Sequence, residues 1–92
     1  MEEKLESLAK VKNKLGLHVR PATTIAKILQ KRKAKVTLTY KGESVNARSI
    51  MSIMILAAPK NAKLKIEVEG PDAKETLNDL LLAFDNKFGE DG

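Results

Sequence analysis

Apolar and polar positions along this chain follow two periods, one typical of strands and one of amphipathic helices. Apolar residues recur every three or four positions over residues 19–31, which predicts a helix. Apolar and polar residues alternate over 35–41 and again over 63–69, which predicts two half-buried strands. These three segments are the firmest expectations that the pattern supports.

Weaker signals fill the gaps between these segments. Residues 8–12 are expected to form a short first strand, and 44–46 are expected to form a brief strand that pairs with 35–41 across a turn at Gly42. Ser49 suits the cap of a short helix over 50–56, because its hydroxyl accepts a bond from a helical N–H.

The last predicted element is a C-terminal helix that begins after Gly70-Pro71. Asp72 with Glu75 three residues later has the pattern of a capping box. One face of this helix then carries Ala73, Leu77, Leu80, Leu81, Phe84 and Phe88. Residues 89–92 are expected to fray. The order βαββαβα predicts an α+β fold with one sheet face covered by helices and the other in water.

Composition narrows the class of protein. The 92 residues suit one domain, 1–92, and the absence of cysteine excludes disulfides and cysteine-built metal sites. A single histidine argues against a histidine-built metal site, so we expect no metal and no cofactor. No apolar run approaches the roughly 20 residues of a membrane span, and the charged N-terminus is unlike a signal peptide. We therefore expect a cytoplasmic protein that does not bind membranes.

The charge balance suggests acidic partners. Seventeen basic and 12 acidic residues give a net charge of +5, which permits nucleic-acid binding without requiring it. The three aromatic residues are too few for a base-stacking platform, and only Tyr40 lies on a predicted strand. A small basic RNA-binding domain stays as an alternative, although we expect no nucleic-acid partner.

Candidate chemistry is concentrated in Gly16–Ala22. This segment holds the only histidine, His18, with Arg20 two residues later and Pro21 in the first turn of the predicted helix. The first N–H groups of a helix lack intrahelical acceptors and lie at the positive end of the helix dipole, where anions bind. An imidazole and a guanidinium there suit a phosphoryl group. Local physics alone slightly favours a surface histidine without chemistry.

Two motifs instead favour the interpretation of His18 as a residue that carries a phosphoryl group. The segment Gly16-Leu17-His18-Val19-Arg20-Pro21-Ala22 resembles the active-site signature of the HPr family, the histidine-containing phosphocarriers of the sugar phosphotransferase system. The segment Lys41–Met54 resembles a second motif of that family, and the likeness covers about residues 8–88. It implies an open-faced β-sandwich, a four-stranded antiparallel sheet with three helices on one face.

The resemblance also implies a chemistry. A member of the family is a carrier and not an enzyme: His18 would accept a phosphoryl group on Nδ1 from phosphorylated enzyme I and pass it to a IIA domain. Phosphoenolpyruvate is the ultimate source. Arg20, with Ala22 and Thr23, would bind the phosphate oxygens. We expect the carrier to be a monomer.

Regulation and docking follow from the same resemblance. Ser49 matches a site that HPr kinase/phosphorylase modifies where that enzyme exists, and an HPr-like regulator acting mainly through Ser49 is a further alternative. Methionine is an adaptable side chain at surfaces that bind several partners. The docking residues would be Val19, Thr23, Lys27, Ile50, Met51 and Met54.

Four positions depart from the family pattern. Leu15 replaces a small polar residue that helps to orient the histidine, and Ser52 replaces a glycine in the second helix. Ala57 and Asn61 replace glycines in the loop that follows. These changes suggest a divergent carrier that serves regulation more than sugar uptake.

Overall fold

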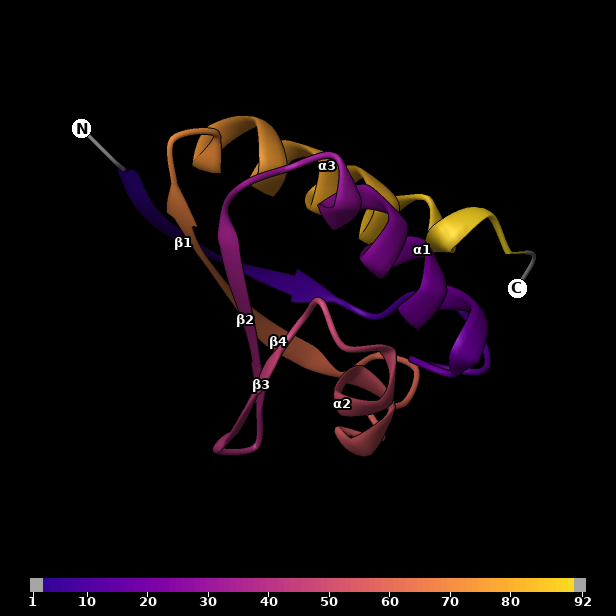
Figure 1. Ribbon diagram of the computed structural model, residues 1–92. Coiled ribbons are helices and arrows are strands. Elements are labelled where there is room, and N and C mark those ends of the chain that lie inside the picture. The colour runs from indigo at the N-terminus through magenta and orange to yellow at the C-terminus, as the bar shows by residue number, and fades with distance from the viewer. Residues whose placement is uncertain (1–2, 91–92) are drawn as a thin grey trace.

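An antiparallel sheet with the strand order β1-β4-β2-β3 organises the chain, seen in a computed structural model that describes residues 3–90 (Figure 1). The elements in chain order are β1 (Glu3–Lys10), α1 (Val19–Gln30), β2 (Lys35–Tyr40), β3 (Glu43–Asn46), α2 (Ile50–Ile55), β4 (Lys63–Gly70), α3 (Ala73–Asp85) and a 3₁₀ turn (Lys87–Gly89). The predicted order βαββαβα is confirmed.

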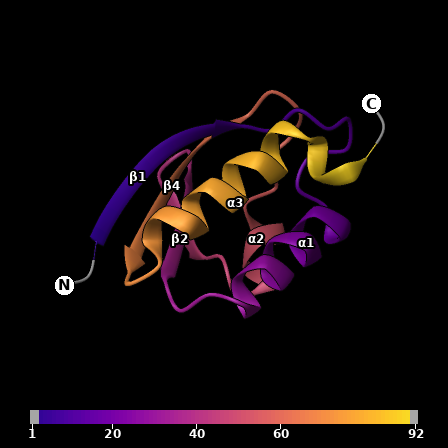
Figure 2. The same cartoon turned by 90° about the horizontal axis from the view of Figure 1, so that it is seen from above.

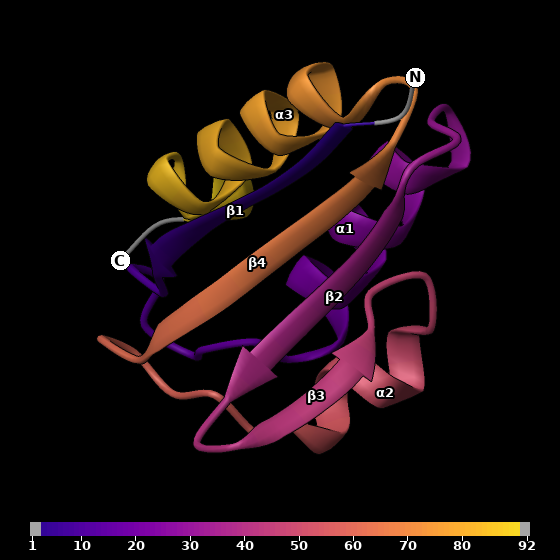
Figure 3. The same ribbon diagram turned by 90° about the vertical axis from the view of Figure 1, so that its left-hand side faces the viewer.

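The sheet has one covered face and one open face. In β4 the apolar side chains Leu64, Ile66 and Val68 are fully buried, while Lys63 and Lys65 between them are exposed. This alternation places the core between the sheet and the helices. Figure 3 looks onto the open face, with the helices behind the strands. The α+β open-faced sandwich expected from the sequence is thus confirmed.

Two longer helices, α1 and α3, lie side by side across the covered face (Figure 2). Helix α1 buries Ile25 and Leu29, and α3 buries Leu80 and Phe84 against the strands. The shorter α2 contacts α1 and inserts Ile53 into the same core. Within residues 3–90, no helix has the length and apolarity that crossing a bilayer requires.

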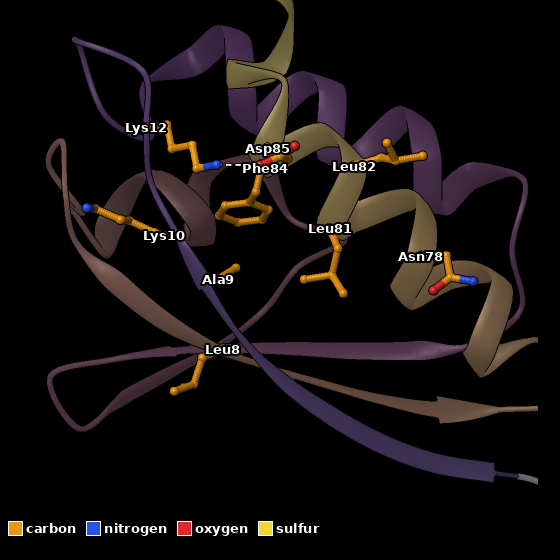
Figure 4. Close-up of a pocket in the computed structure, with 9 residues that line it drawn as sticks. All are labelled: Leu8, Ala9, Lys10, Lys12, Asn78, Leu81, Leu82, Phe84 and Asp85. Carbon is orange, nitrogen blue, oxygen red and sulfur yellow. Dashed lines mark hydrogen bonds and ion pairs between the residues drawn. The ribbon is translucent and has the colours of Figure 1, made fainter.

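The first strand is longer than predicted. It begins at Glu3 and not at Leu8, because it pairs with β4 along its whole length, from Glu3 opposite Gly70 to Lys10 opposite Lys63. Leu8 lies on the open face and is 70% exposed. An open hollow between β1 and α3 is flanked by Leu8 and Leu82, and the predicted site residues are not among its lining (Figure 4).

The predicted capping box of α3 is wrong. Asp72 does precede the helix, but its side chain makes no cap hydrogen bond. Its two carboxylate oxygens accept instead from the backbone N–H groups of Lys33 and Ala34, both at 2.9 Å. These bonds, led by the one from Lys33, lower the pKa of Asp72 below its usual value. The carboxylate therefore ties the loop after α1 to the start of α3.

The chain end also differs from the prediction. Helix α3 stops at Asp85, so Phe88 lies beyond it, in a turn where Lys87, Phe88 and Gly89 all have positive φ. Phe88 is buried, with its ring centroid 4.8 Å from that of Phe84. The expected fraying is therefore wrong for residues 89 and 90, which are held close to the fold; Asp91 and Gly92 lie outside the described residues.

Candidate functional site

The loop before α1 is held by a close backbone approach. Gly16 has φ +71°, and a Cβ there would lie 2.4 Å from the Ala58 carbonyl oxygen and 2.9 Å from Pro59 Cα. The next residue, Leu17, donates its N–H to that same Ala58 oxygen at 2.9 Å. Only glycine combines this φ with this approach. The loop that follows α2 therefore sets the position of the segment leading to His18.

His18 occupies the N-cap position of α1, as predicted. Its side chain makes no cap hydrogen bond and is 28% exposed, so the imidazole is partly open to solvent. Its Nε2 lies 2.7 Å from Oε2 of Glu90, a residue 72 positions away in the chain. The Glu90 side chain is only 9% exposed. The histidine is thus anchored through one ring nitrogen.

The first turn of α1 presents two backbone donors. Ala22 already donates its N–H to the His18 carbonyl at 3.1 Å, and Pro21 has no N–H. This leaves the N–H groups of Val19 and Arg20 without an intrahelical acceptor. A phosphoryl group on His18 would meet these two N–H groups at the positive end of the helix. The Thr23 hydroxyl donates to the Val19 carbonyl at 2.7 Å.

Arg20 projects into solvent beside the histidine. Its side chain is 75% exposed, and Nη1 lies 3.8 Å from Glu90 Oε2. An exposed pair at this distance is weak, so the guanidinium is free to move. A phosphate dianion next to His18 would be a better partner, because it accepts two parallel N–H bonds from one guanidinium.

Asn13 and Glu90 are the site residues that sequence reasoning missed. Asn13 is fully buried, and its Nδ2 donates to the Gly16 carbonyl at 2.7 Å and to Glu90 Oε1 at 2.9 Å. The Glu90 carboxylate therefore bridges Asn13 and His18. The sequence marks neither residue: Asn13 reads as an ordinary asparagine in a polar loop, and Glu90 lies in the stretch expected to fray.

The second predicted motif forms the start of α2. Ser49 is the N-cap, as predicted, and its hydroxyl accepts from the Ser52 N–H at 3.2 Å. Helix α2 then exposes Met51 (75%) and Met54 (41%), whereas Ile50 is half-buried against the core.

Exposed side chains around the two helices form a mixed surface. Val19, Lys27, Leu15 and Ile55 are exposed, and Thr23 is half-buried. Leu15 and Ile55 were not among the predicted docking residues. Among residues 3–90 there is no group of three or more His, Cys, Asp or Glu arranged to hold a metal ion.

Two of the departing positions have left-handed backbone. Ala57 has φ +50° and Asn61 has φ +73°, so both adopt the conformation that glycine favours. Asparagine tolerates it, while alanine is strained there. Ala57 nevertheless keeps the turn, and its N–H donates to the Met54 carbonyl at 3.0 Å.

Comparison with known proteins places the fold and the two motifs in one family. The family model described as PTS HPr component phosphorylation site matches residues 5–86. The phosphocarrier protein HPr of Chlamydia trachomatis is 41% identical over 86 residues, 94% of this chain and 79% of that protein. The HPr of Xylella fastidiosa is 38% identical over 87 residues, 95% of this chain and 98% of that protein.

A solved HPr structure has the same fold as this chain. The crystal structure of HPr-C-His from Thermoanaerobacter tengcongensis superposes with a TM-score of 0.90 at 34% identity, over 96% of this chain and 99% of that one. These likenesses define a class of small phosphocarriers built on an open-faced sandwich. This chain belongs to the HPr family of the phosphotransferase system.

Proposed function

We propose that His18 accepts a phosphoryl group from phosphorylated enzyme I and passes it to a IIA domain of a sugar permease or regulator. The observation that carries this proposal is a partly exposed imidazole at the N-cap of α1, beside two free helical N–H groups and Arg20. Membership of the HPr family supplies the two partner classes.

Phosphoryl transfer requires a nucleophile and groups that stabilise the negative charge on the phosphoryl oxygens. The lone pair of a His18 ring nitrogen attacks phosphorus, the bond from phosphorus to the donor protein breaks, and its electron pair stays on the donor atom. The N–H groups of Val19 and Arg20, with the Arg20 guanidinium, bind the phosphoryl oxygens as charge develops on them. In the transfer to a IIA domain His18 is the donor. A nucleophile of that domain attacks phosphorus, the bond from phosphorus to the His18 nitrogen breaks, and its electron pair stays on that nitrogen.

Docking involves the exposed side chains of α1 and α2. Met51, Met54 and Val19 offer adaptable apolar contact, and Lys27 adds positive charge for an acidic partner. Such a surface suits a small, transient interface, which a carrier with successive partners requires. We expect the protein to work as a monomer in the cytoplasm, without cofactor or metal.

Ser49 supports a second role. A phosphate on its hydroxyl would lie at the start of α2 and bring about −1.5 to −2 charges next to the exposed methionines. Partners that bind this apolar surface would be repelled while the helix cap remains. An HPr kinase/phosphorylase would be the source of that modification.

The RNA-binding alternative has little support. Tyr40, the only aromatic residue on a strand within residues 3–90, is half-buried and packs against the core. Its ring has the Lys41 ammonium 5.5 Å from the centroid. It does not offer the exposed stacking surface that single-stranded RNA needs.

Mass spectrometry tests the carrier function. The wild type, His18→Ala and Ser49→Ala are incubated with phosphoenolpyruvate and enzyme I, and their intact masses are compared before and after mild acid. We expect one acid-labile phosphoryl group on the wild type and on Ser49→Ala, and none on His18→Ala. Equal labelling of His18→Ala, or no labelling of the wild type by an enzyme I that is active on another carrier, would overturn the proposal.

A further inference from the structure

The Glu90 carboxylate is tightly held beside the candidate site. Its side chain is 9% exposed, and both oxygens accept hydrogen bonds, Oε1 from Asn13 Nδ2 at 2.9 Å and Oε2 facing His18 Nε2 at 2.7 Å. A carboxylate so removed from water is stable only when its oxygens are satisfied. These contacts therefore specify one position for Glu90 and one partner atom on His18.

A tight turn of the backbone just before Glu90 positions its side chain next to His18. Lys87 and Phe88 have φ of +56° and +54°, a conformation that costs non-glycine residues energy and persists only where the surroundings enforce it. Burial of Phe88 against Phe84 holds this turn in place. The Glu90 N–H donates to the Lys87 carbonyl at 2.9 Å, which closes the turn.

An ionised carboxylate accepts hydrogen bonds and donates none. A neutral imidazole carries its proton on one nitrogen only, so a short contact to Glu90 Oε2 requires that proton to lie on His18 Nε2. The lone pair is then on Nδ1. The same bond fixes the rotation of the ring.

We propose that Glu90, held by Asn13, is a positioning residue that keeps the proton of His18 on Nε2 and so presents Nδ1 as the nucleophile for phosphoryl transfer. This inference rests on the proposed carrier function. It assigns a role to a residue near the chain end that no motif in the sequence marks.

The step balances without any further proton transfer. As Nδ1 bonds to phosphorus, the donor bond breaks with its electron pair, and the His18 ring becomes a phosphorylated imidazolium that keeps its Nε2 proton. Glu90 Oε2 then faces a cationic N–H, which strengthens the hydrogen bond. Arg20, 3.8 Å from the same oxygen, is released towards the phosphoryl group.

Three variants distinguish the hydrogen bond that Glu90 accepts from His18 from the effect of its negative charge. Glu90→Ala removes both acceptor oxygens and the charge, while Glu90→Gln loses the charge and keeps one oxygen for two donors, His18 Nε2–H and Asn13 Nδ2. Glu43→Ala, at an exposed position in β3, removes the same charge elsewhere. Thermal unfolding of each variant shows that the fold is retained, and the wild type serves as the reference.

The first readout is the ¹⁵N NMR signature of the His18 ring, which distinguishes the two neutral tautomers, recorded on unphosphorylated protein in alkaline buffer. We expect the Nε2–H form in the wild type and Glu43→Ala, a mixture of tautomers in Glu90→Ala, and an intermediate share of the Nε2–H form in Glu90→Gln, whose single oxygen is shared between two donors. The second readout is the rate of phosphorylation by enzyme I. We expect Glu90→Ala to be slower by about tenfold, Glu90→Gln to lie between, and Glu43→Ala to match the wild type.

A wild-type ring spectrum and a wild-type rate for Glu90→Ala would overturn the assignment of Glu90. A failure of the proposed carrier function would give a different result. A wild type that enzyme I does not label would refute the proposed function, while the tautomer measurement, which uses no phosphoryl donor, would still report on the contact between Glu90 and His18.

Discussion

A methyl group added at Gly16 should destabilise the protein far more than one added at Gly42. Both residues have positive φ, +71° and +82°, so alanine is strained at both. At Gly16 the new Cβ would also lie 2.4 Å from the Ala58 carbonyl oxygen, whereas at Gly42 nothing lies within 4 Å. Gly42→Ala is therefore a matched control that carries the strain without the clash.

The magnitude follows from these contacts. Left-handed strain costs roughly 1 kcal/mol at either site, and restriction of the unfolded chain returns about 0.5 kcal/mol. At Gly16 the clash displaces Ala58 and weakens the 2.9 Å hydrogen bond from Leu17, which adds about 1 kcal/mol for the bond and 1–2 kcal/mol for the displacement. We expect a loss of about 3 kcal/mol for Gly16→Ala and about 0.5 kcal/mol for Gly42→Ala.

Urea and thermal unfolding measure the difference. The chain has no tryptophan, so far-UV circular dichroism is the suitable signal. A loss of about 3 kcal/mol lowers Tm by roughly 12–24 °C in a domain of this size. Equal losses for Gly16→Ala and Gly42→Ala would refute the claim that close backbone approach sets the loop before His18.

Three further predictions test other parts of the fold. Ala57→Gly should raise the free energy of unfolding by about 0.5 kcal/mol because it relieves left-handed strain, whereas Ala26→Gly inside α1 should lower it by about 1 kcal/mol; equal losses in urea titrations would count against this. Asp72→Asn should be less stable than the wild type at neutral pH, and the gap should close as the pH falls through the lowered pKa of Asp72, since the ionised carboxylate is the stabilising form; a constant gap would contradict this assignment. Phe88→Ala should cost about 3 kcal/mol in thermal unfolding, because its ring packs on Phe84; an unchanged Tm would show that the terminal turn adds no stability.

Strands and helices could be predicted from the sequence where buried and exposed residues alternate regularly. In β4 every second residue is fully buried, so the alternation is clean and its bounds could be predicted closely. The first half of β1 could not be predicted, because Leu5 and Ser7 are only half-buried and their backbone is ordered by pairing with β4. Long-range pairing of this kind leaves no local pattern.

Local patterns also located the candidate site but not its support. His18, Arg20 and Pro21 follow one another in sequence, so helix-start rules and the family motif placed them together. The bridge from Asn13 to Glu90 spans 77 positions and depends on left-handed backbone at Lys87 and Phe88, which residue propensities disfavour. Asp72 shows the same limit, because its carboxylate had two possible sets of N–H partners and tertiary contact decided between them.

We propose that Nδ1 of His18 is the atom that carries the phosphoryl group. The most direct test is the heteronuclear NMR spectrum of ¹⁵N-labelled protein after phosphorylation by enzyme I, which shows the ring nitrogen that is coupled to phosphorus. We predict a single phosphorus-bonded nitrogen, His18 Nδ1, with the proton on Nε2 facing Glu90. Phosphorus on Nε2, or on Ser49 with an unmodified His18 ring, would show that Nδ1 is not the carrier atom.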